Sequence, residues 1–149
     1  MIRLFISKLA VTQLLTFPTF SQKKLSMGAY ASTATTLSVV SHETVETQNG
    51  IWKFDDSSFN NDAIVFDHSQ LRRIELLNAA GETEVSVDFK APAVGIWTPH
   101  GKNAPFICIE PWYGVADVAE FEGDIRDRYL MNQLLPGASF MAQYTITIG

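Results

Sequence analysis

Cysteine is almost absent from this sequence, because Cys108 is the only one among 149 residues. A single thiol cannot form an internal disulfide, so we expect a cytoplasmic protein. No apolar run reaches the roughly 18 residues of a transmembrane helix, and we expect no membrane contact. The net charge is −5 and no basic stripe is visible, which excludes a typical nucleic-acid groove.

Acidic residues are missing from residues 1–42, whereas residues 43–149 hold all 16 of them with only 7 basic residues. A serine-containing, acid-free, weakly basic start resembles a mitochondrial transit segment, so mitochondria are an alternative location. The other interpretation is a strand-bearing stretch of the same domain, because Leu14–Phe17 and Thr35–Ser41 are both β-like.

Convincing amphipathic helices are also lacking, and short alternating segments separated by turn residues take their place. The clearest hairpin joins Leu71–Leu77 to Thr83–Lys90 through Asn78–Gly81. Further strands are expected at Gly50–Phe54, Asp62–Phe66, Ala93–Trp97, Phe106–Glu110 and Phe140–Ile148. This pattern predicts an all-β fold, an antiparallel β-sandwich in a single domain over 1–149, with 43–149 as its clearest β region.

The segment PFICIEPWYGVAD at 105–117 attracts attention because an apolar strand ends in a carboxylate. Period-two alternation places Glu110 on one face with Phe106 and Cys108, and Pro111 is expected to end the strand. Burial would raise the pKa of such a carboxyl towards the range useful for proton transfer. The alternative is a Glu at the edge of the core that is paired with an arginine.

The sequence CIEPWYGVAD resembles the signature of the aldose 1-epimerase (galactose mutarotase) family, specifically its LacX-like branch. Three flanking segments resemble the family in the same order: FNNDAIVF at 59–66, VGIWTP at 94–99 and LLPGASFMAQYTITI at 134–148. The resemblance runs from about Ile51 to the C-terminus and covers only the C-terminal part of the family's fold. It implies an incomplete galactose mutarotase-like supersandwich.

The resemblance also implies roles for individual residues. Glu110 would be the general base, and Asp62 would hydrogen-bond sugar hydroxyls, although an Asp at this position could instead satisfy a turn. Trp112 and Trp97 are candidates for packing on a sugar ring, with plain core packing as the alternative. His100 could approach the site from its loop, although a lone loop histidine is usually solvated.

Mutarotation consists of proton transfers and needs no cofactor or metal. The family's proton-donating and ligand-positioning histidines lie upstream of the matched region, and His42, His68 and His100 match neither. We therefore expect a form of the enzyme that has the base but lacks the donor. It would act on a free aldose such as galactose or glucose and would have little activity alone.

Two other functions remain open. The chain could be a carbohydrate-binding protein without catalysis, or a hexose-6-phosphate 1-epimerase. The last needs arginines at the phosphate, and the adjacent Arg72 and Arg73 would point to opposite faces of a strand. Open strand edges would allow a homo-oligomer.

Overall fold

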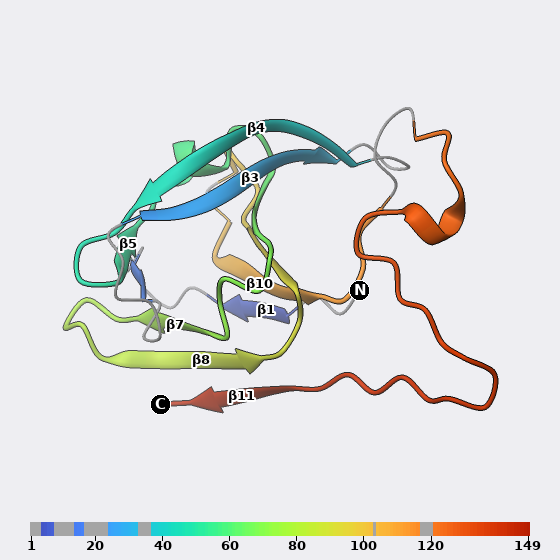
Figure 1. Cartoon of the computed structure of the whole chain (residues 1–149). Helices are drawn as coiled ribbons and strands as arrows, with labels where there is room; N and C mark the ends of the chain where they lie inside the picture. The colour runs from blue at the N-terminus through green and yellow to red at the C-terminus, as the bar shows by residue number, and fades with distance from the viewer. Residues whose placement is uncertain (1–3, 8–13, 17–23, 33–36, 103, 117–120) are drawn as a thin grey trace.

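The computed structural model describes residues 4–7, 14–16, 24–32, 37–102, 104–116 and 121–149. The described elements are eleven strands and two short 3₁₀ helices (Figure 1). In chain order they are β1 (Leu4–Ser7), β2 (Leu14–Thr16), β3 (Lys24–Ser32), β4 (Leu37–Glu46), β5 (Ile51–Lys53), η1 (Asp56–Phe59), β6 (Ala63–Phe66), β7 (Arg73–Leu77), β8 (Thr83–Phe89), β9 (Ala93–Trp97), β10 (Phe106–Trp112), η2 (Ile125–Asp127) and β11 (Tyr144–Ile148). No helix in these residues has the length and apolarity to cross a membrane.

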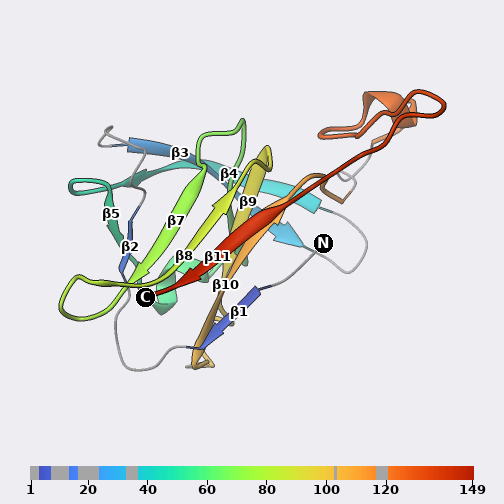
Figure 2. The same cartoon turned by 90° about the horizontal axis from the view of Figure 1, so that it is seen from below.

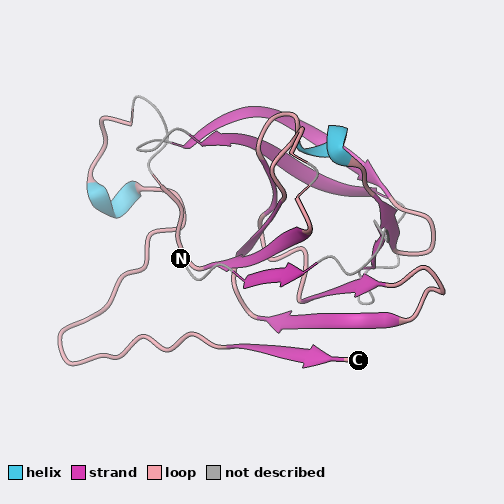
Figure 3. Ribbon diagram, turned by 180° about the vertical axis from the view of Figure 1, so that it is seen from behind, coloured by secondary structure: helices cyan, strands magenta, loops and turns pink. Residues whose placement is uncertain are grey.

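The strands form two antiparallel sheets (Figure 2). The six-stranded sheet has the order β1-β10-β9-β6-β3-β4, and the five-stranded sheet has the order β11-β8-β7-β2-β5. The view coloured by secondary structure shows how little helix there is (Figure 3). The predicted all-β antiparallel sandwich is therefore confirmed.

The core lies between the two sheets, where apolar residues from alternate strand positions meet. Ile64, Ile96 and Ile109 of the six-stranded sheet belong to one buried cluster with Ile74 and Val87 of the five-stranded sheet. Burial of such side chains stabilises the fold by about 1.5–3 kcal/mol each. Because alternate residues point to opposite faces, the neighbours of these isoleucines face outwards.

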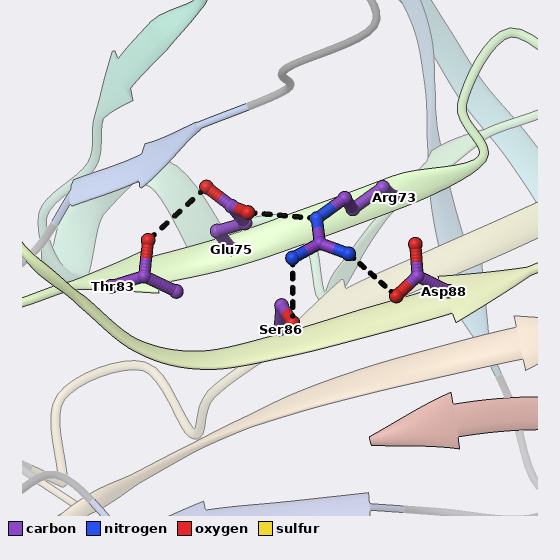
Figure 4. A network of polar contacts seen from close by, with 5 residues as sticks. All are labelled: Arg73, Glu75, Thr83, Ser86 and Asp88. Atoms are coloured by element: carbon purple, nitrogen blue, oxygen red, sulfur yellow. Dashed lines mark hydrogen bonds and ion pairs between the residues drawn. The ribbon is translucent and has the colours of Figure 1, made fainter. Parts of the chain in front are cut away.

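The predicted hairpin of β7 and β8 is confirmed, and its outer face has a polar network (Figure 4). Nε of Arg73 donates to Oε1 of Glu75, and Nη1 donates to Oδ2 of Asp88, both at 2.7 Å. Nη2 also donates to Ser86 at 3.0 Å. The hydrogen bonds to Glu75 and Asp88 raise the pKa of Arg73 above its usual value. This arginine is held on the outside of the five-stranded sheet.

Strand boundaries differ from the prediction in two places. The expected end of the strand at Pro111 is wrong, because β10 continues to Trp112 and pairs Pro111 with Val94. Among the described residues, β1 pairs with Phe106–Ile109 and does not extend to Pro111, so the missing proline N–H breaks no described bond to β1. The last strand begins at Tyr144 instead of Phe140.

The segment 1–42 contributes strands to both sheets. β1 pairs with β10 and β3 pairs with β6 in the six-stranded sheet, while β2 lies between β5 and β7 in the other. The predicted strands near Leu14 and Thr35 correspond to β2 and to β4, which extends further, to Glu46.

Residues 121–143, which we call the arm, leave the sandwich after β10 and return as β11 (Figures 1 and 2). The arm includes η2, as the sequence suggested for Asp124–Arg128, and little else of regular structure. Its large side chains are mostly exposed, with Leu135 at 80% and Met141 at 85%. The arm thus extends apolar residues away from the core.

Candidate functional site

Glu110 lies on β10 and faces away from the interior of the sandwich. Its neighbours Ile107 and Ile109 belong to the core cluster, so alternation places Glu110 and Trp112 on the outer face of the six-stranded sheet. Glu110 is nevertheless only 3% exposed. This burial agrees with the prediction that the carboxylate at the end of this apolar strand is withdrawn from water.

Trp112 covers this part of the outer face. Its Nε1–H donates to Oε2 of Glu110 at 3.1 Å, and because an indole can only donate, the carboxyl oxygen accepts. The indole lies directly against the backbone of Gly95, where an added Cβ would be 2.6 Å from Cζ2 of Trp112. Gly95 is the cross-strand partner of Glu110. A glycine at this position therefore makes room for the ring beside the acid.

Trp97 shares the outer face with Glu110. Gly95 pairs with Glu110 and Trp97 pairs with Cys108, which places both partners of β9 on the same side of the sheet. The Trp97 side chain is half-buried, and its ring centroid is 6.3 Å from that of Phe106. The two candidate tryptophans thus flank the row that contains the carboxylate.

Asp62 is not part of a strand. The prediction that the strand begins at Asp62 is wrong, because β6 begins at Ala63 and Asp62 has a φ of 76° in the turn after η1. Its N–H donates to the carbonyl oxygen of Phe59 at 3.1 Å. A short polar side chain tolerates this left-handed conformation, and Asp62 is half-buried there.

His100 lies in the loop between β9 and β10 and is exposed. This loop enters β10 at Phe106, and Glu110 lies four residues further along, about 13 Å at the rise of an extended strand. The final residue of the family signature, Asp117, lies outside the described residues.

A polar cluster that the sequence did not suggest lies at the end of β6. Asp67 accepts a hydrogen bond from the Tyr129 hydroxyl at 2.9 Å, and its other oxygen is 2.7 Å from Nδ1 of His68. Asp67 is buried, whereas the His68 side chain is 76% exposed. Residues 63, 65 and 67 share the outer face because successive strand residues point to opposite sides. This alternation could have identified Asp67 as a polar residue on the same face as Glu110. The cluster fastens the arm to the six-stranded sheet.

A cavity of about 480 Å³ lies between the end of β10 and the arm. Its lining includes Trp112 and Tyr113 at the end of β10, Phe140 of the arm and Tyr144 of β11. Trp112 therefore borders both the cavity and the Glu110 carboxylate. Within the described residues no three His, Cys, Asp or Glu side chains are grouped to hold a metal ion.

Comparisons with known proteins agree with the fold. The chromosomal and plasmid LacX proteins of Lactococcus lactis are each 32% identical to this chain over 95 residues, which are 63% of this chain and 31% of theirs. A galactose mutarotase related enzyme from Lactobacillus acidophilus superposes on 92% of this chain with a TM-score of 0.71 and 27% identity. Over part of their length, the chain is similar in sequence to LacX proteins and in fold to a galactose mutarotase related enzyme.

The family relationship is partial in length. The chain spans 45% of the L. acidophilus structure, and so less than half of the relatives that it matches. A galactose mutarotase-like protein from Lactobacillus casei has the same fold, with a TM-score of 0.65 and 17% identity over 89% of this chain and 44% of its own. No protein-family model matches the sequence.

Proposed function

We propose that this chain carries part of the sugar site of a mutarotase, in which Glu110 is the general base for exchange between the α and β anomers of a free aldose. The observation that supports this is the buried Glu110 carboxylate on the outer face of the six-stranded sheet, beside the indole of Trp112. The relatives named LacX and galactose mutarotase related enzyme make a sugar such as galactose or glucose the expected ligand.

The reaction needs two proton transfers in each direction. The Glu110 carboxylate takes the proton of the anomeric hydroxyl while an acid gives a proton to the ring oxygen, and the C1–O5 bond breaks. The open aldehyde turns about C1–C2, and the ring closes on the other face as both protons return. Atoms and charge balance without a cofactor.

Two tryptophans and an aspartate complete the proposed site. The indoles of Trp112 and Trp97 offer apolar faces on the same side of the sheet as Glu110, suited to the C–H face of a sugar ring. Asp62 is proposed to accept hydrogen bonds from sugar hydroxyls. His100 stays a weaker candidate, because its loop joins the distant end of β10.

Activity of this chain alone is expected to be weak. The sequence offers no histidine that matches the family's proton donor, and loss of a general acid costs roughly 10²–10⁴-fold in rate. The chain also spans less than half of its relatives.

A second candidate function is sugar binding without catalysis. It is favoured by the Trp112 indole, which covers the Glu110 carboxylate. With 3% exposure and the Trp112 indole as a hydrogen-bond donor, the carboxylate is not open to a substrate hydroxyl unless the ring moves. The phosphate-sugar alternative gains no support from Arg73, which is engaged by two carboxylates on the outside of the opposite sheet.

NMR measurement of anomer exchange, together with titration of tryptophan fluorescence by galactose and glucose, tests the proposal. The wild-type chain is expected to bind at millimolar concentration, about −4 kcal/mol. Any exchange above the uncatalysed rate should vanish in Glu110→Gln. The exposed Glu122→Gln serves as a matched control and should change neither property.

The outcomes separate the two candidates. Binding that survives in Glu110→Gln without measurable exchange in the wild type favours the binding protein. No fluorescence response to any aldose contradicts both functions, and turnover near that of a full-length relative contradicts the view that the chain lacks its acid.

A further inference from the structure

We infer that β11 and the uncharged part of the arm, residues 129–143, form the contact surface between two copies of this chain. The evidence begins with composition: residues 129–149 contain no Asp, Glu, Lys, Arg or His. Six large apolar side chains of this stretch are exposed in the single chain. They are Leu134, Leu135, Phe140, Met141, Ile146 and Ile148, which we call the apolar strip. Exposed apolar side chains gathered in one stretch of the chain suit a protein contact.

β11 is the edge of the five-stranded sheet among the described strands, and it lacks the usual protection of an edge. Edge strands normally contain charged residues that prevent pairing with another chain. The edge strands β4 and β5 follow this rule, since they include Glu46 and Lys53. β11 (YTITI) has only threonines between its apolar positions. Its free backbone groups are therefore open to a further strand.

The face that β11 exposes belongs to the inside of the sandwich. Tyr144, Ile146 and Ile148 pair with Phe89, Val87 and Val85, whose side chains are buried in the core. Cross-strand partners share a face, so β11 extends the core-facing side of its sheet. Ile148 is nevertheless 72% exposed. A covering surface at this position would complete the core.

A second copy fits the surface better than a charged partner does. Each copy has a net charge of −5, yet the strip itself has no charge, so two copies meet there without like-charge contacts. An antiparallel pairing of β11 with itself about Ile146 is self-complementary, as twofold symmetry requires. It places Tyr144 opposite Ile148 and Thr145 opposite Thr147, which are favourable cross-strand pairs. The two five-stranded sheets then become one continuous sheet.

Sedimentation of the full chain tests the inference by mass. A dimer of the 16.6 kDa chain is expected, with Ile148→Lys shifting it to monomer. Ile125→Lys is the matched control, because Ile125 is a similarly exposed isoleucine outside the uncharged stretch, and it should stay dimeric. A monomeric wild type at all concentrations overturns the inference, as does a chain that associates only with an added, different polypeptide.

A crosslinking pair tests the register without relying on a destabilising charge. In the proposed pairing Ile146 lies opposite its own counterpart, where antiparallel Cα atoms are about 4.5–5.5 Å apart and within reach of a disulfide. Mild oxidation should therefore link Ile146→Cys into a covalent dimer and leave Thr145→Cys unlinked. Native Cys108 is fully buried, so the wild-type chain gives the background level of crosslinking. Equal linkage of both variants, or none of Ile146→Cys, overturns the proposed pairing.

Discussion

Substitution of Gly95 by alanine tests whether the Trp112 indole lies against β9 as described. The added Cβ would stand 2.6 Å from Cζ2 and 3.0 Å from Cε2 of that ring, well inside van der Waals contact. The ring is large and buried, and it cannot yield as a flexible chain end would. The indole must therefore shift, and its hydrogen bond to Glu110 should break.

The magnitude follows from two opposing effects. Overpacking at a close contact costs about 1–3 kcal/mol. Replacing glycine by alanine at an ordinary φ reduces the entropy of the unfolded chain and returns about 0.4–1 kcal/mol. We expect a net loss of about 1–2 kcal/mol in the free energy of unfolding.

Urea unfolding with tryptophan emission as the probe measures both consequences. Gly114→Ala is the matched control, because its new Cβ would meet only ordinary contacts at 3.6 Å and beyond. Gly95→Ala combined with Trp112→Phe should recover part of the loss, since the clashing atoms are then gone. A Gly95→Ala chain as stable as the wild type, with unchanged emission, would refute the packing of this ring.

Two further predictions concern the arm. Tyr129→Phe removes the hydroxyl that donates to Asp67 and should lower the free energy of unfolding by about 1 kcal/mol. Proteolysis within 121–143 should become faster, and an arm equally protected in both proteins would contradict this tether. Asp124 should titrate with a pKa of about 2, because hydrogen bonds from Arg126 stabilise its ionised form. The stabilisation is present above the usual 3.8 and disappears as pH falls towards 2. In Arg126→Ala the pKa of Asp124 measured by ¹³C NMR should rise, because the side-chain hydrogen bonds are lost while that from the backbone N–H of residue 126 remains, and an unmoved value would contradict the pairing.

Alternation within single segments predicted much of the fold, because it depends only on neighbouring residues. The period of two placed Glu110 with Cys108 and away from Ile109, as the structure has it. The hairpin of β7 and β8 was equally local. By contrast β3 was not predicted, since KLSMGAYAS is small and polar and forms a strand through pairing with β4 and β6.

The surroundings of the site depend on register between distant segments, which no local pattern contains. Nothing in the sequence near Gly95 shows that it lies under the Trp112 ring, or that Asp67 meets Tyr129 from 62 residues away. The prediction that the strand ends at Pro111 was wrong for the same reason. Whether a proline can stay in a strand depends on which strand lies beside it, and among the described residues β1 pairs with β10 only as far as Ile109.

The pairing of β1 with β10 has a consequence for biosynthesis. Leu4 leaves the ribosome 105 residues before its partner Ile109, a delay of about 5–20 s at usual translation rates. Until then β1 has no neighbour on that side, and the six-stranded sheet cannot close around its core. This pairing is non-local, and contacts between segments so far apart in the sequence form slowly.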